Sequence, residues 1–206
     1  MARLQDHELT LLKNYVPEKA ADDVLYFMHS YHIHLKIKRE RKAILGDYRP
    51  AMHGKPHTIS INATLNTYHF LITFVHELAH LVTFLNHHHR VQPHGKEWKG
   101  VYRILMSRFL GKEIFPADVE EAIQQSLHKS GASTCSEPEL YKVLRRYDEK
   151  KVGYFIEELD PGTIFFTDKG KRFQLMNKRR TRYECKELST GHVYLFPGIY
   201  EVTPEV

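Results

Sequence analysis

The sequence predicts an α+β fold, with helices and a small sheet over residues 1–150 and a β-rich part over residues 151–206. Residues 66–86 form one long apolar stretch with helical spacing, which is typical of a buried helix. Short segments with an apolar residue at every second position precede that stretch, as in half-buried strands. Beyond residue 152, β-type segments alternate with glycine-containing turns. We therefore expect two domains with a boundary near residue 150.

The first 65 residues predict two helices followed by two strands. Asp6 fits the N-cap of a short helix, and Pro17 fits the first turn of the next one. Every second residue from Ile33 to Ile37 is apolar, which predicts a strand. Gly46, Asp47 and Pro50 predict a turn, and residues 58–62 predict the second strand.

The long helix at residues 66–86 carries polar residues on one narrow face. Asn66 is a suitable N-cap. At about 100° per residue, five polar positions fall within a sector of roughly 80°. A buried polar group without a partner costs about 1–3 kcal/mol, so this stripe needs partners. Its members are His69, Thr73, His76, His80 and Thr83.

The elements beyond this helix follow from spacing and turn residues. Further helices are predicted at residues 94–110, 116–129 and 136–150, the last with a capping box of Ser136 and Glu139. The predicted strands of the β-rich part are residues 154–156, 163–166, 172–175, 183–185 and 192–196.

The composition excludes several classes of protein. The chain has 15 His, 2 Cys and a formal charge of +5. Two cysteines cannot form a disulfide framework or a four-cysteine zinc site. No uninterrupted apolar run reaches the 18 or more residues of a membrane span, and the first ten residues are too polar for a signal peptide. We expect a cytoplasmic protein without a membrane-spanning segment.

Residues 76–80 read His-Glu-Leu-Ala-His, an HExxH motif. On a helix, His76 and His80 lie one turn apart on one face and can bind a single zinc ion. Glu77 can take a proton from a zinc-activated water and return it to a leaving amine. The motif therefore predicts zinc-dependent hydrolysis of peptide bonds.

A catalytic zinc needs a third protein ligand and an open position. Thr83 and Asn86 stand where a metzincin has Gly and His, which excludes that class. His94 lies at the start of the next helix, which could return antiparallel to the motif. The residues alone leave several candidates open: His87, His88, His89, His94 and Glu97.

Two segments resemble the SprT-like family of zincin metallopeptidases, whose relatives include Spartan-type proteases that cut proteins crosslinked to DNA. They are VHELAHLVTF at residues 75–84 and HGKEWKGVYRIL at residues 94–105. The resemblance covers about residues 15–110 and implies a zincin-like helical core. It also implies that His76, His80 and His94 hold the zinc, with Glu77 as the catalytic residue. From the residues themselves, Trp98 is expected either to face the active-site layer or, as we favour, to anchor the third-ligand helix in the core.

The tail departs from this family pattern. Many SprT-like proteins end in a zinc ribbon with CxxC pairs, but this chain has only Cys135 and Cys185. We expect one zinc and a β-rich subdomain that resembles a zinc ribbon without its cysteines. Residues 179–185 are interpreted as a remnant ribbon strand.

Residues 169–186 carry a net charge of +7, from eight Lys or Arg and one acidic residue. With Phe173 and Tyr183 between them, these cations predict a DNA-binding surface. The alternative is a solvated hairpin with its aromatics turned inward. The predicted DNA contacts are Lys169, Lys171, Arg172, Lys178, Arg179, Arg180 and Arg182.

A second basic cluster, residues 36–42 with Arg41 among them, adjoins the first predicted strand, where cations commonly protect an exposed edge. The rival to the enzyme is a non-catalytic, zinc-containing module that binds nucleic acid. Glu77 discriminates the two functions, since a structural zinc site needs no acid beside its ligand.

Overall fold

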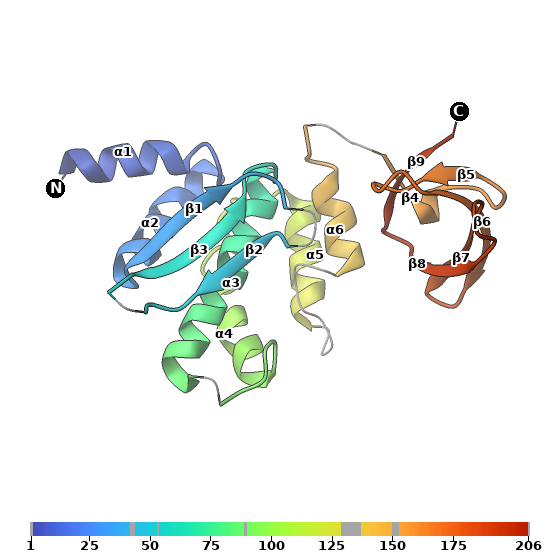
Figure 1. Cartoon of the computed structure of the whole chain (residues 1–206). Coiled ribbons are helices and arrows are strands. Elements are labelled where there is room, and N and C mark those ends of the chain that lie inside the picture. The colour runs from blue at the N-terminus through green and yellow to red at the C-terminus, as the bar shows by residue number, and fades with distance from the viewer. Residues whose placement is uncertain are drawn as a thin grey trace. The chain divides into compact units, whose positions relative to one another are not determined.

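The computed structural model describes residues 2–41, 44–52, 54–88, 90–128, 137–149 and 153–205. The chain divides into two compact units between Asp148 and Glu149, two residues before the predicted boundary. The architecture is α+β, as expected, with helices and a small sheet in the first unit and a larger sheet in the second (Figure 1).

The first unit contains six α-helices, one 3₁₀ helix and three strands among its described residues. They are α1 (Ala2–Leu12), η1 (Glu18–Ala20), α2 (Ala21–Ser30), β1 (Ile33–Lys38), β2 (Gly46–Arg49), β3 (His57–Asn62), α3 (Thr67–His87), α4 (Lys96–Ser107), α5 (Ala117–His128) and α6 (Pro138–Arg145).

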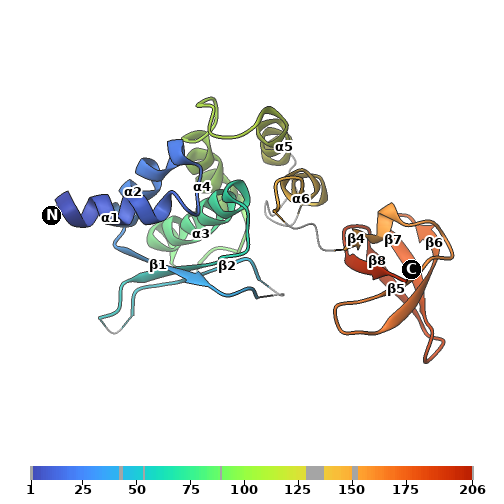
Figure 2. The same cartoon turned by 90° about the horizontal axis from the view of Figure 1, so that it is seen from above.

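The three strands form a sheet in the order β1-β3-β2. β1 runs parallel to β3, and β2 runs antiparallel to it. Helices α1 to α4 lie over one face of this sheet (Figure 2). The last four residues of β3 are buried, as expected for a central strand.

Helix α3 is the core of the first unit. Every residue from Phe70 to Ala79 is buried, and the Asn66 side chain caps the helix by accepting a hydrogen bond from the His69 N–H at 2.9 Å. Its length and apolar composition alone would allow it to cross a membrane, but 72% of that window is buried inside the structure. Buried core helices pass the same composition test. The predicted helix over residues 66–86 is confirmed.

Two predictions for the N-terminal part are wrong. Helix α1 begins at Ala2, so Asp6 lies inside it and is not its N-cap. Residues 46–49 form β2 instead of the predicted turn. This strand has one large apolar residue, Tyr48, and it is held by pairing with β3 and by packing against α3. Those contacts are tertiary, so the local pattern does not reveal them.

The second unit holds a six-stranded sheet in the order β4-β9-β5-β6-β7-β8, with every neighbouring pair antiparallel. Its core includes Phe165, Phe173, Leu175 and Cys185. Its elements are β4 (Tyr154–Phe155), η3 (Ile156–Glu158), β5 (Ile164–Phe166), β6 (Arg172–Arg179), β7 (Arg182–Glu187), β8 (Val193–Pro197) and β9 (Glu201–Pro204).

The tail differs from expectation in two details. The sequence does not predict β9, whose single buried residue is Val202. Residues 179–185 are not one strand, because Arg179 ends β6 and Arg182 begins β7. Cys185 is buried, and burial raises the pKa of its thiol to about 12, as for an inert core cysteine. Cys135 and Ser136, with its predicted capping box, lie outside the described residues.

Candidate metal centre

Helix α3 brings His76 and His80 together. The two residues are one helical turn apart, and their Nε2 atoms lie 3.2 Å from each other. His76 is buried and His80 is half-buried, so the pair sits where the buried helix meets the surface. This is the geometry that the HExxH spacing predicts.

His94 supplies the third nitrogen from the chain between α3 and α4. Its Nε2 lies 3.0 Å from that of His76 and 3.0 Å from that of His80. His94 has φ 57°, a backbone conformation that is uncommon for a non-glycine residue and is often found at functional sites. The next residue, Gly95, is the N-cap of α4, and a Cβ there would lie 3.0 Å from the Gln92 carbonyl oxygen. A tight turn therefore aims His94 at the α3 pair.

The structure distinguishes His94 from most of the other candidate third ligands. Among the described residues, only His76, His80 and His94 form a donor group that could hold a metal ion. His88 is the C-cap of α3 and packs its ring edge-on against Phe84. Glu97 lies in the first turn of α4, outside the donor group. His89 is not among the described residues.

The donor set fits a zinc ion. A tetrahedral zinc with Zn–N distances of about 2.0–2.1 Å places its ligand nitrogens about 3.3–3.4 Å apart. The observed separations of 3.0–3.2 Å are close to this value. Burial lowers the pKa of His76 to about 3 and that of His80 to about 4, with neighbouring histidines adding to both shifts. The pKa of His94 is lowered by burial and by Lys99. Neutral imidazoles with converging lone pairs are the form that binds zinc.

Trp98 and Tyr102 of α4 support the three imidazoles. The Trp98 ring is 1% exposed, and its centroid lies 4.6–5.2 Å from the centroids of all three histidine rings. Tyr102 stacks on the Trp98 ring with the centroids 5.1 Å apart, and its own centroid lies 6.3 Å from that of His76. Two rigid aromatic side chains thus restrict the rotation of the histidine rings. This agrees with the expected anchoring role of Trp98.

Glu77 is held in a buried position beside the donor group. Its side chain is 7% exposed. Burial, followed by the charge of Asp47, raises the pKa of Glu77 to about 7, while a hydrogen bond from the Tyr48 backbone and the charge of Arg41 act in the opposite direction. A general base with a pKa near the working pH is well matched to proton transfer.

Strand β2 closes over Glu77 at Gly46. A Cβ at Gly46 would lie 2.7 Å from a Thr73 side-chain carbon and 2.8 Å from a Glu77 carboxylate oxygen. Only glycine lets the strand approach the helix this closely. The sequence shows Gly46 followed by Asp47, but it does not predict that this pair lies next to Glu77.

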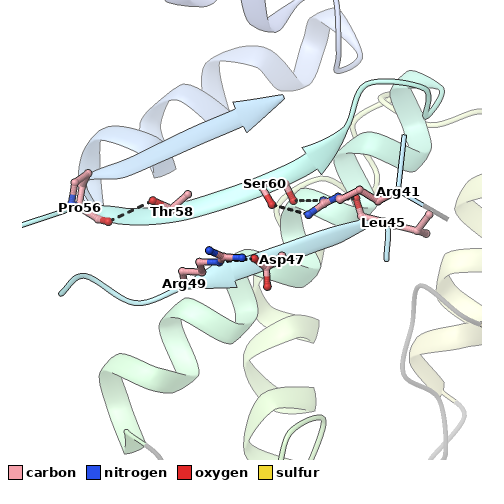
Figure 3. Close-up of polar contacts among 7 residues, drawn as sticks. All are labelled: Arg41, Leu45, Asp47, Arg49, Pro56, Thr58 and Ser60. Atoms are coloured by element: carbon pink, nitrogen blue, oxygen red, sulfur yellow. Dashed lines mark hydrogen bonds and ion pairs between the residues drawn. The ribbon is translucent and has the colours of Figure 1, made fainter. Parts of the chain in front are cut away.

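Arg41 holds the chain that leads into β2. Its guanidinium donates to the Ser60 hydroxyl at 3.0 Å and the Ser60 carbonyl at 3.2 Å, and it reaches the Leu45 carbonyl at 3.5 Å (Figure 3). It also donates to the Asn62 side chain at 2.9 Å. The basic cluster at residues 36–42 is therefore not uniformly solvated, since Arg41 turns inward to order the site.

A pocket of about 650 Å³ opens over the donor group. Gly46, Asp47, Tyr48 and Pro50 form one wall, and Val91, Gln92 and Pro93 form another. His76, Glu77, His80 and His94 line it as well. The volume is in the range of ligand-binding sites in proteins.

Two further polar residues of the α3 stripe, Thr73 and His69, have local roles. The Thr73 hydroxyl donates to the His69 carbonyl at 2.8 Å, within the helix. The His69 ring packs edge-on against Tyr141, and burial lowers its pKa to about 4. His69 is therefore a neutral core residue, and the Thr73 side chain lies against Gly46 of β2.

The predicted DNA-contact residues are only partly available. Lys171 pairs with Glu187 at 2.8 Å, Arg172 pairs with Glu205, and Arg179 lies 3.6 Å from Glu184. Lys178 sits over the Tyr183 ring at 5.4 Å. Phe173 is buried in the core, so it cannot stack on a base as predicted. Among the described residues, Lys169, Arg180 and Arg182 are exposed without such contacts.

The SprT-like family model matches residues 18–121, just over half of the chain. This chain belongs to the SprT-like family. Its first unit is thus a zincin-like, metallopeptidase-type domain, in agreement with the predicted fold. No solved structure matches the SprT-like chain.

A curated human protein, vacuolar protein sorting-associated protein 11 homolog, is 22% identical to the SprT-like chain over 154 residues. The match covers 75% of this chain but 16% of the human protein. The chain thus spans a small part of that relative. At this identity and coverage, the human protein's role carries no argument about this site.

Proposed function

We propose that this chain is a zinc-dependent metallopeptidase that hydrolyses peptide bonds in protein substrates. The observation that carries the proposal is the convergence of three neutral imidazoles next to a buried glutamate on the wall of an open pocket. The SprT-like family match supports the same reaction class.

His76, His80 and His94 would hold the zinc through their Nε2 atoms. Bound zinc lowers the pKa of water to about 7 and polarises carbonyl groups. Glu77 acts as the general base: its carboxylate accepts a proton from the attacking water and later passes a proton to the leaving amine. The close packing of Gly46 and the Tyr48 backbone hydrogen bond keep this carboxylate at the pocket wall.

The position of β2 supports a polypeptide as the substrate. β2 is the outer strand of the order β1-β3-β2, so one of its sides has no strand neighbour among the described elements. An extended peptide can pair with such an edge through main-chain hydrogen bonds. Since β2 also lines the pocket, a peptide paired with it would cross the pocket beside Glu77.

The geometry favours this enzyme over a non-catalytic zinc module. A structural zinc site is closed by four protein ligands. Here the described residues offer three, and the pocket leaves access for a further group. A buried carboxylate of raised pKa beside the ligands has a role in hydrolysis but none in a purely structural site.

Casein cleavage and self-cleavage by the full chain test the proposal. We expect one zinc per chain by elemental analysis, and we expect cleavage to stop when a chelator removes the metal and to return when zinc is restored. A melting temperature that rises on zinc addition would show that the metal binds the folded state. Protein that holds one zinc per chain yet cleaves neither casein nor itself nor a DNA-bound protein would contradict the proposal.

DNA association is a second part of the proposal, because DNA-associated proteins are the substrates that the family resemblance suggests. It is supported by the exposed cations Lys169, Arg180 and Arg182. We expect the double variant Arg180→Glu/Arg182→Glu to weaken binding of a duplex oligonucleotide. The slope of log Kd against log salt concentration should also fall, by the amount that corresponds to roughly one to two phosphate contacts. The control is Lys36→Glu/Lys38→Glu on β1. Loss of binding in the control alone would place the DNA contact on the first unit.

A further inference from the structure

The outer strand β8 of the second unit has an open backbone edge. It is the last strand in the order β4-β9-β5-β6-β7-β8, so its far side has no strand neighbour among the described residues. The Glu187 N–H donates to the His192 carbonyl at 2.9 Å. By the antiparallel alternation, Tyr194 and Phe196 then bond to β7, while the backbone groups of Val193 and Leu195 point to the open edge.

The side chains of β8 are apolar and unusually exposed. Val193 is 54% exposed and Leu195 is 45% exposed, and both lie on the face opposite to Tyr194, whose ring contacts the core residue Phe173. No residue from Val193 to Pro197 is charged. An apolar edge strand of this kind is a template for pairing with another chain.

The other three sheet edges in the described structure lack this combination. The outer strand β2 of the first sheet carries the charged residues Asp47 and Arg49. In β1, the other outer strand of the first sheet, exposed Lys36 and Lys38 alternate with apolar residues. These cations protect the strand edge from pairing with another chain. The opposite edge of the second sheet, β4, is only two residues long. The lack of protection at β8 therefore marks it as a surface for a partner.

The charges around β8 indicate what kind of partner fits. Lys186 lies directly opposite Val193, and Arg182 lies opposite Pro197, so exposed cations of β7 flank the apolar face at both ends. The Glu184 carboxylate between them is 3.6 Å from Arg179. A partner with acidic residues around an apolar centre complements this surface, whereas a second copy would bring the same cations against it.

We propose that β8 is a docking strand that binds an extended, acidic segment of the protein substrate by adding it as a further strand of the sheet. Val193 and Leu195 would contact alternate apolar side chains of the segment, and Lys186 would pair with one of its carboxylates. The identification of the partner as substrate rests on the proposed function, but the docking itself does not.

Binding to reduced, carboxymethylated α-lactalbumin, an acidic chain that stays unfolded, tests this inference. The full chain carries Glu77→Gln so that the probe remains intact. We expect Val193→Glu/Leu195→Glu to raise the Kd at least tenfold without changing the melting temperature. The matched control is Ile104→Glu on α4, where the replaced aliphatic side chain is 73% exposed, and it should leave the Kd unchanged.

Several results would overturn the inference. One is the absence of saturable binding by the parent protein, and another is an unchanged Kd in the double variant. The others are displacement of the probe by single-stranded oligothymidine even from Arg180→Glu/Arg182→Glu, which lacks the proposed DNA contact, and a parent dimer that Val193→Glu/Leu195→Glu makes monomeric. The last two would assign β8 to nucleic acid or to a second copy. If casein cleavage persists while the double variant binds normally, only the docking strand fails. If binding depends on β8 but no protein is cleaved, only the proposed function fails.

Discussion

Glu77→Gln is expected to lower the rate of casein cleavage by about 10²–10⁴-fold, the usual contribution of a general acid–base residue. The amide is nearly isosteric with the carboxylate but cannot accept the proton of the attacking water. The three imidazoles are unchanged, so the zinc content should stay at one ion per chain. The measurements are initial rates at saturating casein and zinc by elemental analysis.

Stability should not account for that loss. Glu77 is buried at a desolvation cost, which is the main cause of its raised pKa, so a neutral amide is not expected to lower the melting temperature. Glu121→Gln makes the same change at an exposed position on α5 and should cleave casein at the parental rate. Glu77→Asp keeps a carboxylate but shortens its reach, and an intermediate rate is expected. If Glu77→Gln with bound zinc cleaves casein as fast as the parent, Glu77 is not the general base.

The parts of the site that depend on local spacing could be predicted from the sequence. Helix α3 combines a continuous apolar surface with an N-cap at Asn66, and helical periodicity alone places His76 and His80 on one face. β1 has alternating apolar residues and β3 has a continuous run of β-type residues, so both strands could also be predicted from the sequence. Each of these features is determined within one segment of the chain.

The parts that depend on tertiary contacts could not be predicted. β2 has a turn-like sequence, and it is a strand because Arg41 and β3 hold it and because Gly46 fits against Glu77. The sequence pattern around Phe173 does not indicate that its side chain is buried in the core. It also does not indicate that the neighbouring Arg172 forms an ion pair. The excess of cations in residues 169–186 could therefore be read from the sequence. The ion pairs of Lys171 with Glu187 and of Arg172 with Glu205 could not.

The identity of the third zinc ligand could not be decided from sequence spacing alone, so a variant at His94 is the most informative test of the site. His94→Ala is expected to weaken zinc binding by more than about 100-fold, because changes to the residues that merely orient ligands already cost about 10–100-fold. The variant removes one of three converging nitrogens and leaves α3 intact. Zinc affinity by competition with a chromophoric chelator measures the effect, and the zinc-dependent rise in melting temperature should disappear.

Two neighbouring variants separate His94 from its rivals. His88→Ala removes an imidazole that lines the same pocket, and Glu97→Gln removes the carboxylate nearest to His94 in sequence. Neither lies in the donor group, so both should bind zinc with parental affinity. If Glu97→Gln loses the metal while His94→Ala retains it, the site has a carboxylate as third ligand. The turn at Gly95 would then serve to place Glu97, and the convergence of the three Nε2 atoms would not represent the metal-bound state.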